Sequence, residues 1–200
     1  MTDPDAERLA AFMVEAGHLK RSRRTGWWIA GVRDPESVAE HSFRTGVIAY
    51  VLALLEGCDA NRAATLALFH DLPETRLSDI PSTGRPFVST ATAQEVMKTQ
   101  TTDLPAMVAG PLQDLIDEFE SRRTLEAQCA KDADKLECLV QAREYQSQGY
   151  QLVQPWVDTM LAAVRTPSGR RLAAAAVHMT VDAWWHEVVA SYDRRQRSAD

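Results

Sequence analysis

Hydrophobic residues recur along this chain with the spacing of α-helices and nowhere with the alternation typical of β-strands. The first helix, expected over residues 7–19, has apolar residues at i, i+3, i+4 and i+7 on one face: Leu9, Phe12, Met13 and Ala16. The same period predicts further helices over residues 37–55, 59–71, 93–101, 111–120, 125–145, 155–164 and 169–192. Proline, glycine, serine and threonine predict a loop over residues 78–92. The pattern therefore predicts an all-α protein.

Three residues set helix boundaries near the polar part of the sequence. Gly57 is suited to end the helix over 37–55, and Asp59 is suited to cap the next one. Pro73 disfavours helical dihedral angles at the residue before it, so that helix must stop near Asp71. Within the helix over 37–55 we expect four large apolar residues to point inward: Phe43, Val47, Val51 and Leu54.

A chain of 200 residues suits one domain with a large core. The sequence has no internal repeat or linker, so we expect a single domain over 1–200, with C-terminal helices over 155–192 packing on the rest. Apolar residues make up 45% and charged residues 25%, which excludes a disordered class. The longest apolar run, 47–55, has nine residues, against ~20 for a membrane span. We expect a cytoplasmic protein that contacts no membrane.

The charge balance limits the partners of the chain. With 28 acidic and 22 basic residues the net charge is −6, which argues against binding a nucleic-acid polymer. A small basic cluster at Lys20, Arg21, Arg23 and Arg24 is adequate for one phosphate. The three cysteines, at 58, 129 and 138, lack Cys-x-x-Cys spacing, so we expect free thiols in a reducing compartment rather than disulfides or a zinc ribbon.

Four side chains are candidates for a metal site: His41, His70, Asp71 and Asp134. Consecutive residues diverge by about 100° inside a helix, but His70 and Asp71 can converge at the helix end that Pro73 imposes. Two imidazoles and two carboxylates suit Mn, Co, Fe, Zn or Mg. A His-Asp pair is also common by chance, so a capped surface turn is the alternative, and Asp132 competes with Asp134 as a ligand.

Other residues allow two interpretations. Residues His178, Asp182 and His186 fall at i, i+4 and i+8, which could bind a metal but more often forms a solvated helix face. The pair at 184 and 185 favours packing or an oligomer contact. For the pair Trp27 and Trp28, one ring can pack inward while the other lines a pocket.

Four strings occur in a fixed order: Ala-Glu-His-Ser at 39–42, His-Asp-Leu-Pro-Glu at 70–74, Ser-Asp at 78–79, and Lys-Asp-Ala-Asp-Lys-Leu-Glu at 131–137. In this order the chain resembles the HD-domain metal-dependent phosphohydrolases. It is most similar to the small 5′-deoxynucleotidases, through Leu-Lys-Arg at 19–21, Arg-Thr-Gly-Trp at 24–27 and Arg-Asp-Pro-Glu-Ser-Val at 33–38. The resemblance spans about residues 9–146 and is much weaker in the last fifty residues.

The resemblance implies a single-domain HD-type helical bundle that binds one divalent metal ion, with a nucleotide as its small-molecule substrate. It implies metal ligation by His41, His70, Asp71 and Asp134, with Glu74 and Asp79 acting on water and leaving group and Arg24 and Trp27 near the substrate. Homodimers are common among such proteins, so we expect one here.

Three positions depart from the family pattern. Some relatives carry the substrate arginine directly before the tryptophan, where this chain has Gly26, so Arg23 could replace Arg24. Arg85 lies where relatives often place a basic residue, which suggests a phosphate contact. Ser78 stands where a glycine is more usual.

The expected activity is metal-dependent hydrolysis of deoxynucleoside 5′-monophosphates to deoxynucleoside and phosphate. A guanosine tetraphosphate hydrolase would show two acids after the His-Asp pair, whereas Thr75 follows Glu74 here. A di-iron oxygenase would need further histidines between His70 and His178, and none exists. The alternatives are an HD phosphohydrolase for another nucleotide, such as a triphosphate, and a non-catalytic helical interaction module.

Overall fold

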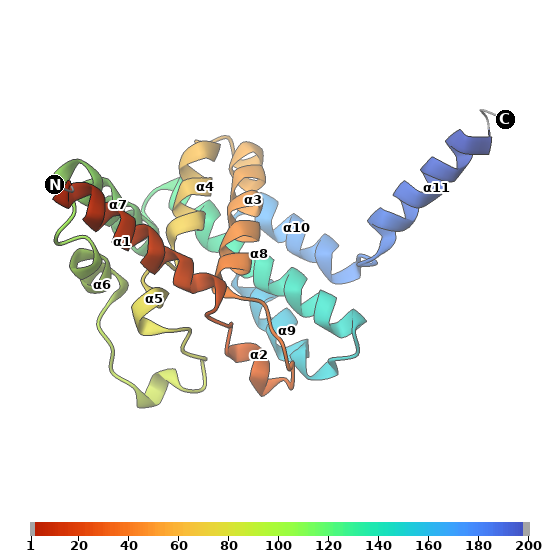
Figure 1. The fold of residues 1–200 in the computed structure, drawn as a ribbon. Helices are drawn as coiled ribbons and strands as arrows, with labels where there is room; N and C mark the ends of the chain where they lie inside the picture. Colours follow the sequence, from red (N-terminus) through yellow and green to blue (C-terminus); the bar gives the residue numbers. More distant parts are fainter. Residues whose placement is uncertain (1–2, 198–200) are drawn as a thin grey trace.

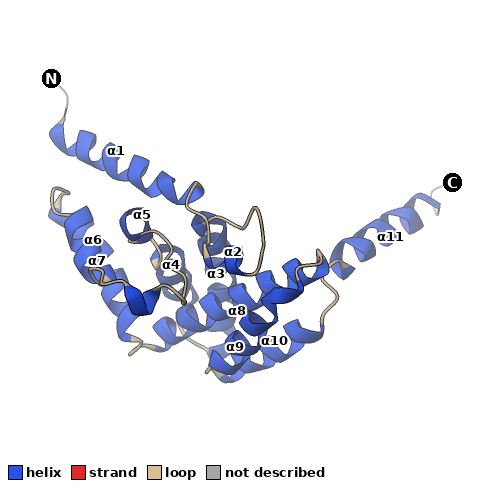
Figure 2. Cartoon of the chain, turned by 90° about the horizontal axis from the view of Figure 1, so that it is seen from below, coloured by secondary structure: helices blue, strands red, loops and turns tan. Residues whose placement is uncertain are grey.

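The computed structural model describes residues 3–197, and within this range the regular structure is helical, apart from one isolated β-bridge between Arg23 and Ser37 (Figure 2). The α-helices are α1 (Pro4–Ala16), α2 (Gly26–Ile29), α3 (Val38–Glu56), α4 (Ala60–Phe69), α5 (Glu74–Leu77), α6 (Ala93–Gln100), α7 (Ala106–Ser121), α8 (Leu125–Ser147), α9 (Gln154–Ala163), α10 (Pro167–His178) and α11 (Ala183–Arg197). Three short 3₁₀ helices are η1 (Gly17–Lys20), η2 (Arg85–Phe87) and η3 (Gln151–Val153). The predicted all-α class is confirmed.

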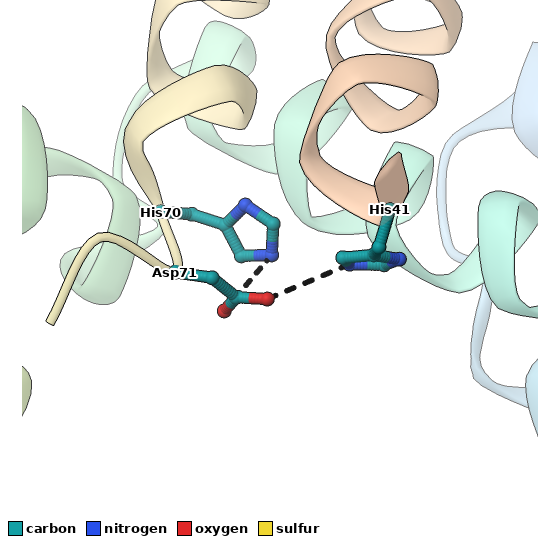
Figure 3. Close-up of side chains that lie close together, drawn as sticks. All are labelled: His41, His70 and Asp71. Atoms are coloured by element: carbon teal, nitrogen blue, oxygen red, sulfur yellow. Dashed lines mark ion pairs between the residues drawn. The ribbon is translucent and has the colours of Figure 1, made fainter. Parts of the chain in front are cut away.

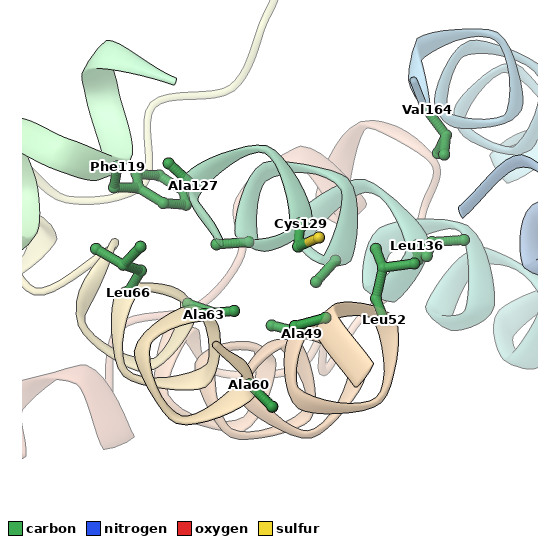
Figure 4. Packing of buried hydrophobic residues seen from close by; sticks show 14 of the residues in the cluster. Ala49, Leu52, Ala60, Ala63, Leu66, Phe119, Ala127, Cys129, Leu136 and Val164 are labelled. Atoms are coloured by element: carbon green, nitrogen blue, oxygen red, sulfur yellow. The ribbon is translucent and has the colours of Figure 1, made fainter. Parts of the chain in front are cut away.

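Helices α3, α4 and α8 pack against one another at the centre of the molecule (Figure 1, Figure 4). Small side chains line this contact and are fully buried: Ala49, Ala53, Ala63, Ala67, Ala130 and Ala133. They let the helix backbones approach closely, while Leu52, Leu66 and Leu136 fill the spaces between them. Each fully buried leucine contributes about 1.5–3 kcal/mol. This core fixes the relative positions of the three elements that carry the polar cluster.

The buried face of α3 is not the one that its large apolar residues predict. Phe43, Val47, Val51 and Leu54 are exposed, Phe43 by 68% and Leu54 by 60%, so the expectation that they point inward was wrong. The buried face instead carries His41, Ser42, Thr45, Gly46, Ala49, Leu52 and Ala53. Close packing against α4 and α8 leaves room for small and polar residues there and turns the larger ones outward.

Helix boundaries near the cluster follow local chemistry. Ser37 caps α3, with its side chain accepting from the backbone N–H of Glu40 while the Glu40 carboxylate accepts from that of Ser37. Gly57 ends α3 with φ 75°, a conformation that glycine adopts without strain, and Asp59 caps α4 as expected. Helix α4 ends at Phe69, and a turn leads through Pro73 into α5. Helix α7 begins at Ala106, so Pro111 lies inside it rather than at its first position.

The C-terminal part differs from its expectation at one place. Helices α9 and α10 pack on α8, with Val157, Val164 and Ala173 buried. The helix expected over 169–192 is broken after His178, and α11 projects away from the rest of the molecule with most of its residues exposed (Figure 1).

One helix, α3, is long and apolar enough by length and composition to cross a membrane. Of its most apolar window, 39% is buried inside the structure, against α4 and α8. Core helices of globular proteins meet the same criterion.

Candidate metal centre and substrate cavity

Four side chains from three parts of the chain converge at one point. His41 comes from α3, and His70 and Asp71 come from the turn after α4 (Figure 3). Asp134 comes from α8. Nε2 of His41 lies 3.6 Å from Oδ2 of Asp71 and 3.3 Å from Oδ1 of Asp134. Nε2 of His70 lies 3.1 Å from Oδ1 of Asp71 and 3.9 Å from Oδ1 of Asp134. The structure thus brings together all four candidate ligands.

The turn after α4 orients His70. Its Nδ1 lies 2.6 Å from the carbonyl oxygen of Ala67, and a carbonyl only accepts, so Nδ1 donates and Nε2 presents its lone pair to the cluster. The ring also packs against Phe119, with centroids 4.8 Å apart. Because Pro73 ends the helical path here, the carboxylate of Asp71 can turn toward the same point as the imidazole before it.

The residues present fit a divalent cation. Nε2 of His41 is buried and has no hydrogen-bond partner, so in the neutral ring its lone pair is available to a ligand. Burial acts to raise the pKa of Asp71 and Asp134, but the imidazoles of His41 and His70 and the nearby Arg24 hold both well below the usual range. Two anionic carboxylates beside two imidazole nitrogens form a donor set for Mn, Co, Fe, Zn or Mg.

A proton competes with a cation for His41. Burial and the Arg24 guanidinium act to lower its pKa, but the carboxylates of Glu137 and Asp134 outweigh them and raise the pKa to about 10. A metal ligand must be the neutral imidazole, so cation binding displaces this proton.

Asp132 lies outside the cluster. Its Oδ2 accepts from the backbone N–H groups of Arg165 and Thr166, at 2.9 and 2.6 Å, and its Oδ1 lies 3.3 Å from the Lys135 ammonium. These bonds fasten the start of α10 to α8. Of the two aspartates, Asp132 and Asp134, the structure places Asp134 in the cluster.

Glu74 begins α5, one turn past the cluster, and lines the adjoining cavity. Its Oε2 is buried without a hydrogen-bond partner. Burial raises its pKa, the negative charges of Asp71 and Asp79 add to the rise, and the pKa reaches about 9. In the metal-free protein this carboxyl group therefore carries a proton at neutral pH.

Asp79 lines the same cavity and is held by Thr25. Its Oδ2 accepts from the backbone N–H of Thr25 at 2.5 Å and from the Thr25 hydroxyl at 3.0 Å. The hydroxyl also lies 2.7 Å from the Asp79 carbonyl oxygen. Ser78, just before it, has φ 61°, a backbone conformation that residues other than glycine adopt only at a cost in free energy.

The two neighbouring arginines point to different places. Nη1 of Arg24 lies 3.4 Å from Oδ2 of Asp71, inside the cluster. Arg23 instead bonds Asp34 at 2.9 Å and the Pro35 carbonyl at 3.0 Å, away from the cluster. Arg24 is therefore the arginine that lines the cavity.

Trp27 is almost wholly buried, at 2% exposure, and is among the residues that line the cavity. Its ring packs against Tyr145 and Trp156, with centroids 5.2 and 5.6 Å apart, and its Nε1 donates to Glu36 at 3.0 Å. Trp28 is 52% exposed. The inward ring of the pair is thus also the one that borders the cavity.

The cavity has a volume of about 540 Å³, within the usual range for small-molecule sites. Basic side chains are spread around its wall: Arg24, Arg85, Arg122, Lys131 and Lys135. Arg85 is exposed at the rim, where its Nε donates to the Ile80 carbonyl at 3.3 Å. Another part of the wall is largely apolar and includes Trp27, Trp156 and Met160. The cavity suits an anion that carries a less polar group.

Sequence reasoning missed the support behind His41. Nδ1 of His41 lies 2.5 Å from Oε2 of the buried Glu137, which Arg44 binds from the other side. Glu36 lies near the same pair. Helical spacing is the signal that could have found them, because Glu137 follows Asp134 by three residues and Arg44 follows His41 by three.

The second candidate metal group, His178, Asp182 and His186, is not among the sets of side chains that the described part of the chain brings within metal-binding distance. The break between α10 and α11 separates His178 from the other two residues. Nε2 of His186 lies 3.1 Å from Oδ2 of Asp182, and both side chains are exposed. This pair forms a solvated contact at the start of α11.

Residues 16–174 match the HD domain family. The match covers more than half of the chain, so the chain belongs to this family, as the resemblance predicted. It is 36% identical to the 5′-deoxynucleotidase HDDC2 of Homo sapiens over 143 residues, which cover 70% of each chain. It is 32% identical to the 5′-deoxynucleotidase hdd1 of Schizosaccharomyces pombe, over 69% of this chain and 72% of that one.

Two solved structures have a similar fold. A conserved hypothetical protein from Pyrococcus furiosus superposes with a TM-score of 0.70 and 28% identity, covering 85% of this chain and 99% of that one. A predicted metal-dependent phosphohydrolase from Magnetospirillum magnetotacticum, at 24% identity, superposes with a TM-score of 0.64, over 96% of this chain and 95% of that one.

Proposed function

We propose that this protein is a metal-dependent 5′-deoxynucleotidase, which hydrolyses deoxynucleoside 5′-monophosphates to deoxynucleosides and phosphate. The observation that carries the proposal is the convergence of two imidazoles and two carboxylates in a cavity lined by basic side chains. The names of the relatives at 32% and 36% identity support the substrate class.

His41, His70, Asp71 and Asp134 would hold one divalent cation, drawn from Mn, Co, Mg, Fe or Zn. When bound, such a cation draws charge from a phosphoryl oxygen and makes a neighbouring water easier to deprotonate. Phosphate monoesters hydrolyse extremely slowly without a catalyst, and most of the acceleration comes from positioning and charge stabilisation.

Glu74 and Asp79 supply the proton transfers in this proposal. Oε2 of Glu74 has no competing partner. A divalent cation held beside it would lower the pKa of the Glu74 carboxyl and release its proton, and the carboxylate would then orient the attacking water and accept its proton. Asp79, which Thr25 holds at the cavity wall, would act on the departing sugar oxygen.

Basic residues would bind the phosphate and the apolar wall would bind the nucleoside. Arg24 is closest to the cluster, and Arg85 reaches from the rim. The chain has no Gly-rich polyphosphate loop, which favours a monophosphate. Close packing against Trp27 and its neighbours leaves little tolerance for a 2′-hydroxyl, which favours the deoxy sugar.

We further propose a cytoplasmic homodimer. Exposed apolar side chains on α3, including Phe43, Val47 and Leu54, support self-association, because monomers rarely expose contiguous apolar patches. The unpaired cysteines support a reducing compartment. Sedimentation equilibrium of the purified protein would give twice the chain mass if the dimer forms and the chain mass if it does not.

The activity is tested by phosphate release from deoxy- and ribonucleoside mono-, di- and triphosphates, with Mn, Co, Mg and Zn supplied separately. We expect the highest kcat/KM with deoxynucleoside monophosphates. Equal or faster turnover of ribonucleotides would contradict the sugar preference, and preference for triphosphates would favour the alternative HD phosphohydrolase. Protein that binds no metal and releases no phosphate would be an interaction module.

A further inference from the structure

A chain of hydrogen bonds runs from the surface to the back of His41. Oε2 of Glu137 faces Nδ1 of His41 at 2.5 Å. Oε1 of the same carboxylate accepts from Nε and Nη2 of Arg44, at 2.9 and 2.7 Å. Each carboxylate oxygen thus has its own partner.

Helices α3 and α8 build this chain along their seam. His41 and Arg44 lie one turn apart on α3, while Glu137, Gln141 and Glu144 follow one another along α8. Oxygens of Gln141 and Glu144 accept from Arg44 at 2.6 and 2.7 Å, which fixes the guanidinium in place. Glu137 and His41 are both fully buried. Burying a carboxylate is costly unless it is paired, and Arg44 compensates this one.

The carboxylate determines which nitrogen of His41 can bind a ligand. A carboxylate in this setting only accepts hydrogen bonds, so Nδ1 of His41 must carry a hydrogen. In the neutral ring Nε2 then has the free lone pair, and Nε2 is the buried atom without a hydrogen-bond partner that faces Asp71 and Asp134. We propose that Glu137, held by Arg44, is a positioning residue that fixes the tautomer of His41 for metal binding, an inference that rests on the proposed metal site.

The inference predicts a specific rearrangement in the variant Glu137→Gln. Arg44 offers two donors to Oε1, so the amide would turn its oxygen toward Arg44 and its NH₂ toward His41. An NH₂ group cannot accept from Nδ1, so the hydrogen of the ring would move to Nε2 and block the ligand position. The variant keeps the size of the side chain but reverses the direction of one hydrogen bond.

Removing the donors of Arg44 should release the amide. In Glu137→Gln/Arg44→Met, nothing pulls the amide oxygen away from His41, so it can accept from Nδ1 and restore the free Nε2. Arg44→Met alone keeps the Glu137 carboxylate facing Nδ1. A purely structural role for the pair predicts the opposite, because the double variant loses more native contacts than either single one.

The test is titration of the full-length protein with Co²⁺, followed by its visible absorption spectrum, with no substrate present. We expect Glu137→Gln to bind Co²⁺ 10- to 100-fold more weakly than the unaltered protein. We expect the double variant to recover at least half of the lost Co²⁺ affinity on a logarithmic scale. Arg44→Met alone should weaken Co²⁺ binding by less than threefold. Circular dichroism checks that each variant is folded.

Glu118→Gln is the matched control. Oε2 of Glu118 accepts from Nε and Nη2 of Arg62, so this variant weakens the same kind of arginine pair between α4 and α7, away from His41. It should leave Co²⁺ affinity unchanged within twofold. Unchanged affinity in Glu137→Gln, or a double variant weaker than Glu137→Gln, would overturn the inference alone. No Co²⁺ binding by the unaltered protein would overturn the metal site and the inference together.

Discussion

The contribution of Glu74 to the stability of the folded protein depends on pH. Burial and the charge of Asp71 raise its pKa from 4.5 to about 9. The folded state therefore holds a proton that the unfolded chain releases at lower pH. Stability from this group is fully present below pH 4.5 and is lost as the pH rises toward 9, so the metal-free protein should weaken over that interval.

Glu74→Gln removes this dependence, because glutamine stays neutral. In protein stripped of metal with a chelator, we expect the variant to be more stable than the unaltered protein at pH 8, by more than about 1.4 kcal/mol, the worth of one pKa unit. At pH 5 the two should differ little. Urea unfolding at both pH values measures the difference, with the exposed Glu187→Gln as control. An equal difference at both pH values would contradict the prediction.

The same variant separates chemistry from binding when metal is supplied. If Glu74 accepts the proton of the attacking water, Glu74→Gln should keep its metal and its nucleotide affinity while kcat falls by about 10² to 10⁴. Metal content, nucleotide affinity and kcat are measured on one preparation. Unchanged kcat would remove Glu74 from the mechanism and leave Asp79 as the candidate.

Ser78 stores backbone strain between Glu74 and Asp79. Its φ of 61° is one that a residue with a side chain adopts at a cost of about 1–3 kcal/mol. Ser78→Gly should therefore raise the free energy of unfolding by about 1 kcal/mol, after the greater entropy of glycine in the unfolded chain is subtracted. Thermal and urea unfolding measure it, and Ser78→Ala, which retains the strain, should not gain. A less stable glycine variant would be the contrary result.

At the scale of helices, the two aspartates of α8 have different roles because their side chains point in different directions. Asp134 faces His41, whereas Asp132, two residues earlier, receives the backbone N–H groups at the start of α10. Residues two apart on a helix lie on different faces, so neither can replace the other.

Alanine at the two positions should therefore have opposite effects. Asp134→Ala should lose bound metal and activity and keep the fold. Asp132→Ala should retain its metal but lose about 1–3 kcal/mol of stability, because the N–H groups of Arg165 and Thr166, just before α10, are left without an acceptor. Elemental analysis and thermal unfolding decide it. Full metal content in Asp134→Ala would dismiss it as a ligand.

Sequence periodicity predicted most of the helices but not which face of α3 is buried. Large apolar residues dominate hydrophobic periodicity, whereas the real contact with α4 and α8 uses Gly46, Ala49 and Ala53, whose small size allows close approach. The prediction that His41 converges with His70 and Asp71 depended on the order of motifs in a known family. Helical spacing could place Glu137 near Asp134 and Arg44 near His41, but the contact between Glu137 and Arg44 is seen only in the fold, because the two residues lie on different helices.

At the scale of the molecule, α11 is set apart from the packed body (Figure 2). Its large apolar residues are exposed, among them Trp184, Val188 and Tyr192. The sequence predicted one long helix over 169–192, because the apolar pattern continues through the break after His178. We therefore expect the fold of the remaining chain to depend little on this segment.

Truncation after Asp182 tests that independence. The shortened protein should keep its thermal midpoint within about 2 °C and its kcat within twofold, since none of the side chains that the structure describes in α11 lines the candidate cavity. Calorimetry and phosphate release measure both. A large fall in the midpoint would show that α11 packs on another surface in solution.

The candidate ligands come from α3, from the turn after α4 and from α8, which are far apart in sequence. A cation held there is therefore a cross-link between segments that must separate when the chain unfolds. Binding that favours the folded state adds about 2.7 kcal/mol when free metal is at 100 times its Kd. Unfolded chains are what cellular proteases remove, so a shortage of the metal would lower the lifetime of the protein as well as its rate of turnover. The supply of one ion would thus set both how much of this protein persists and how fast each copy works.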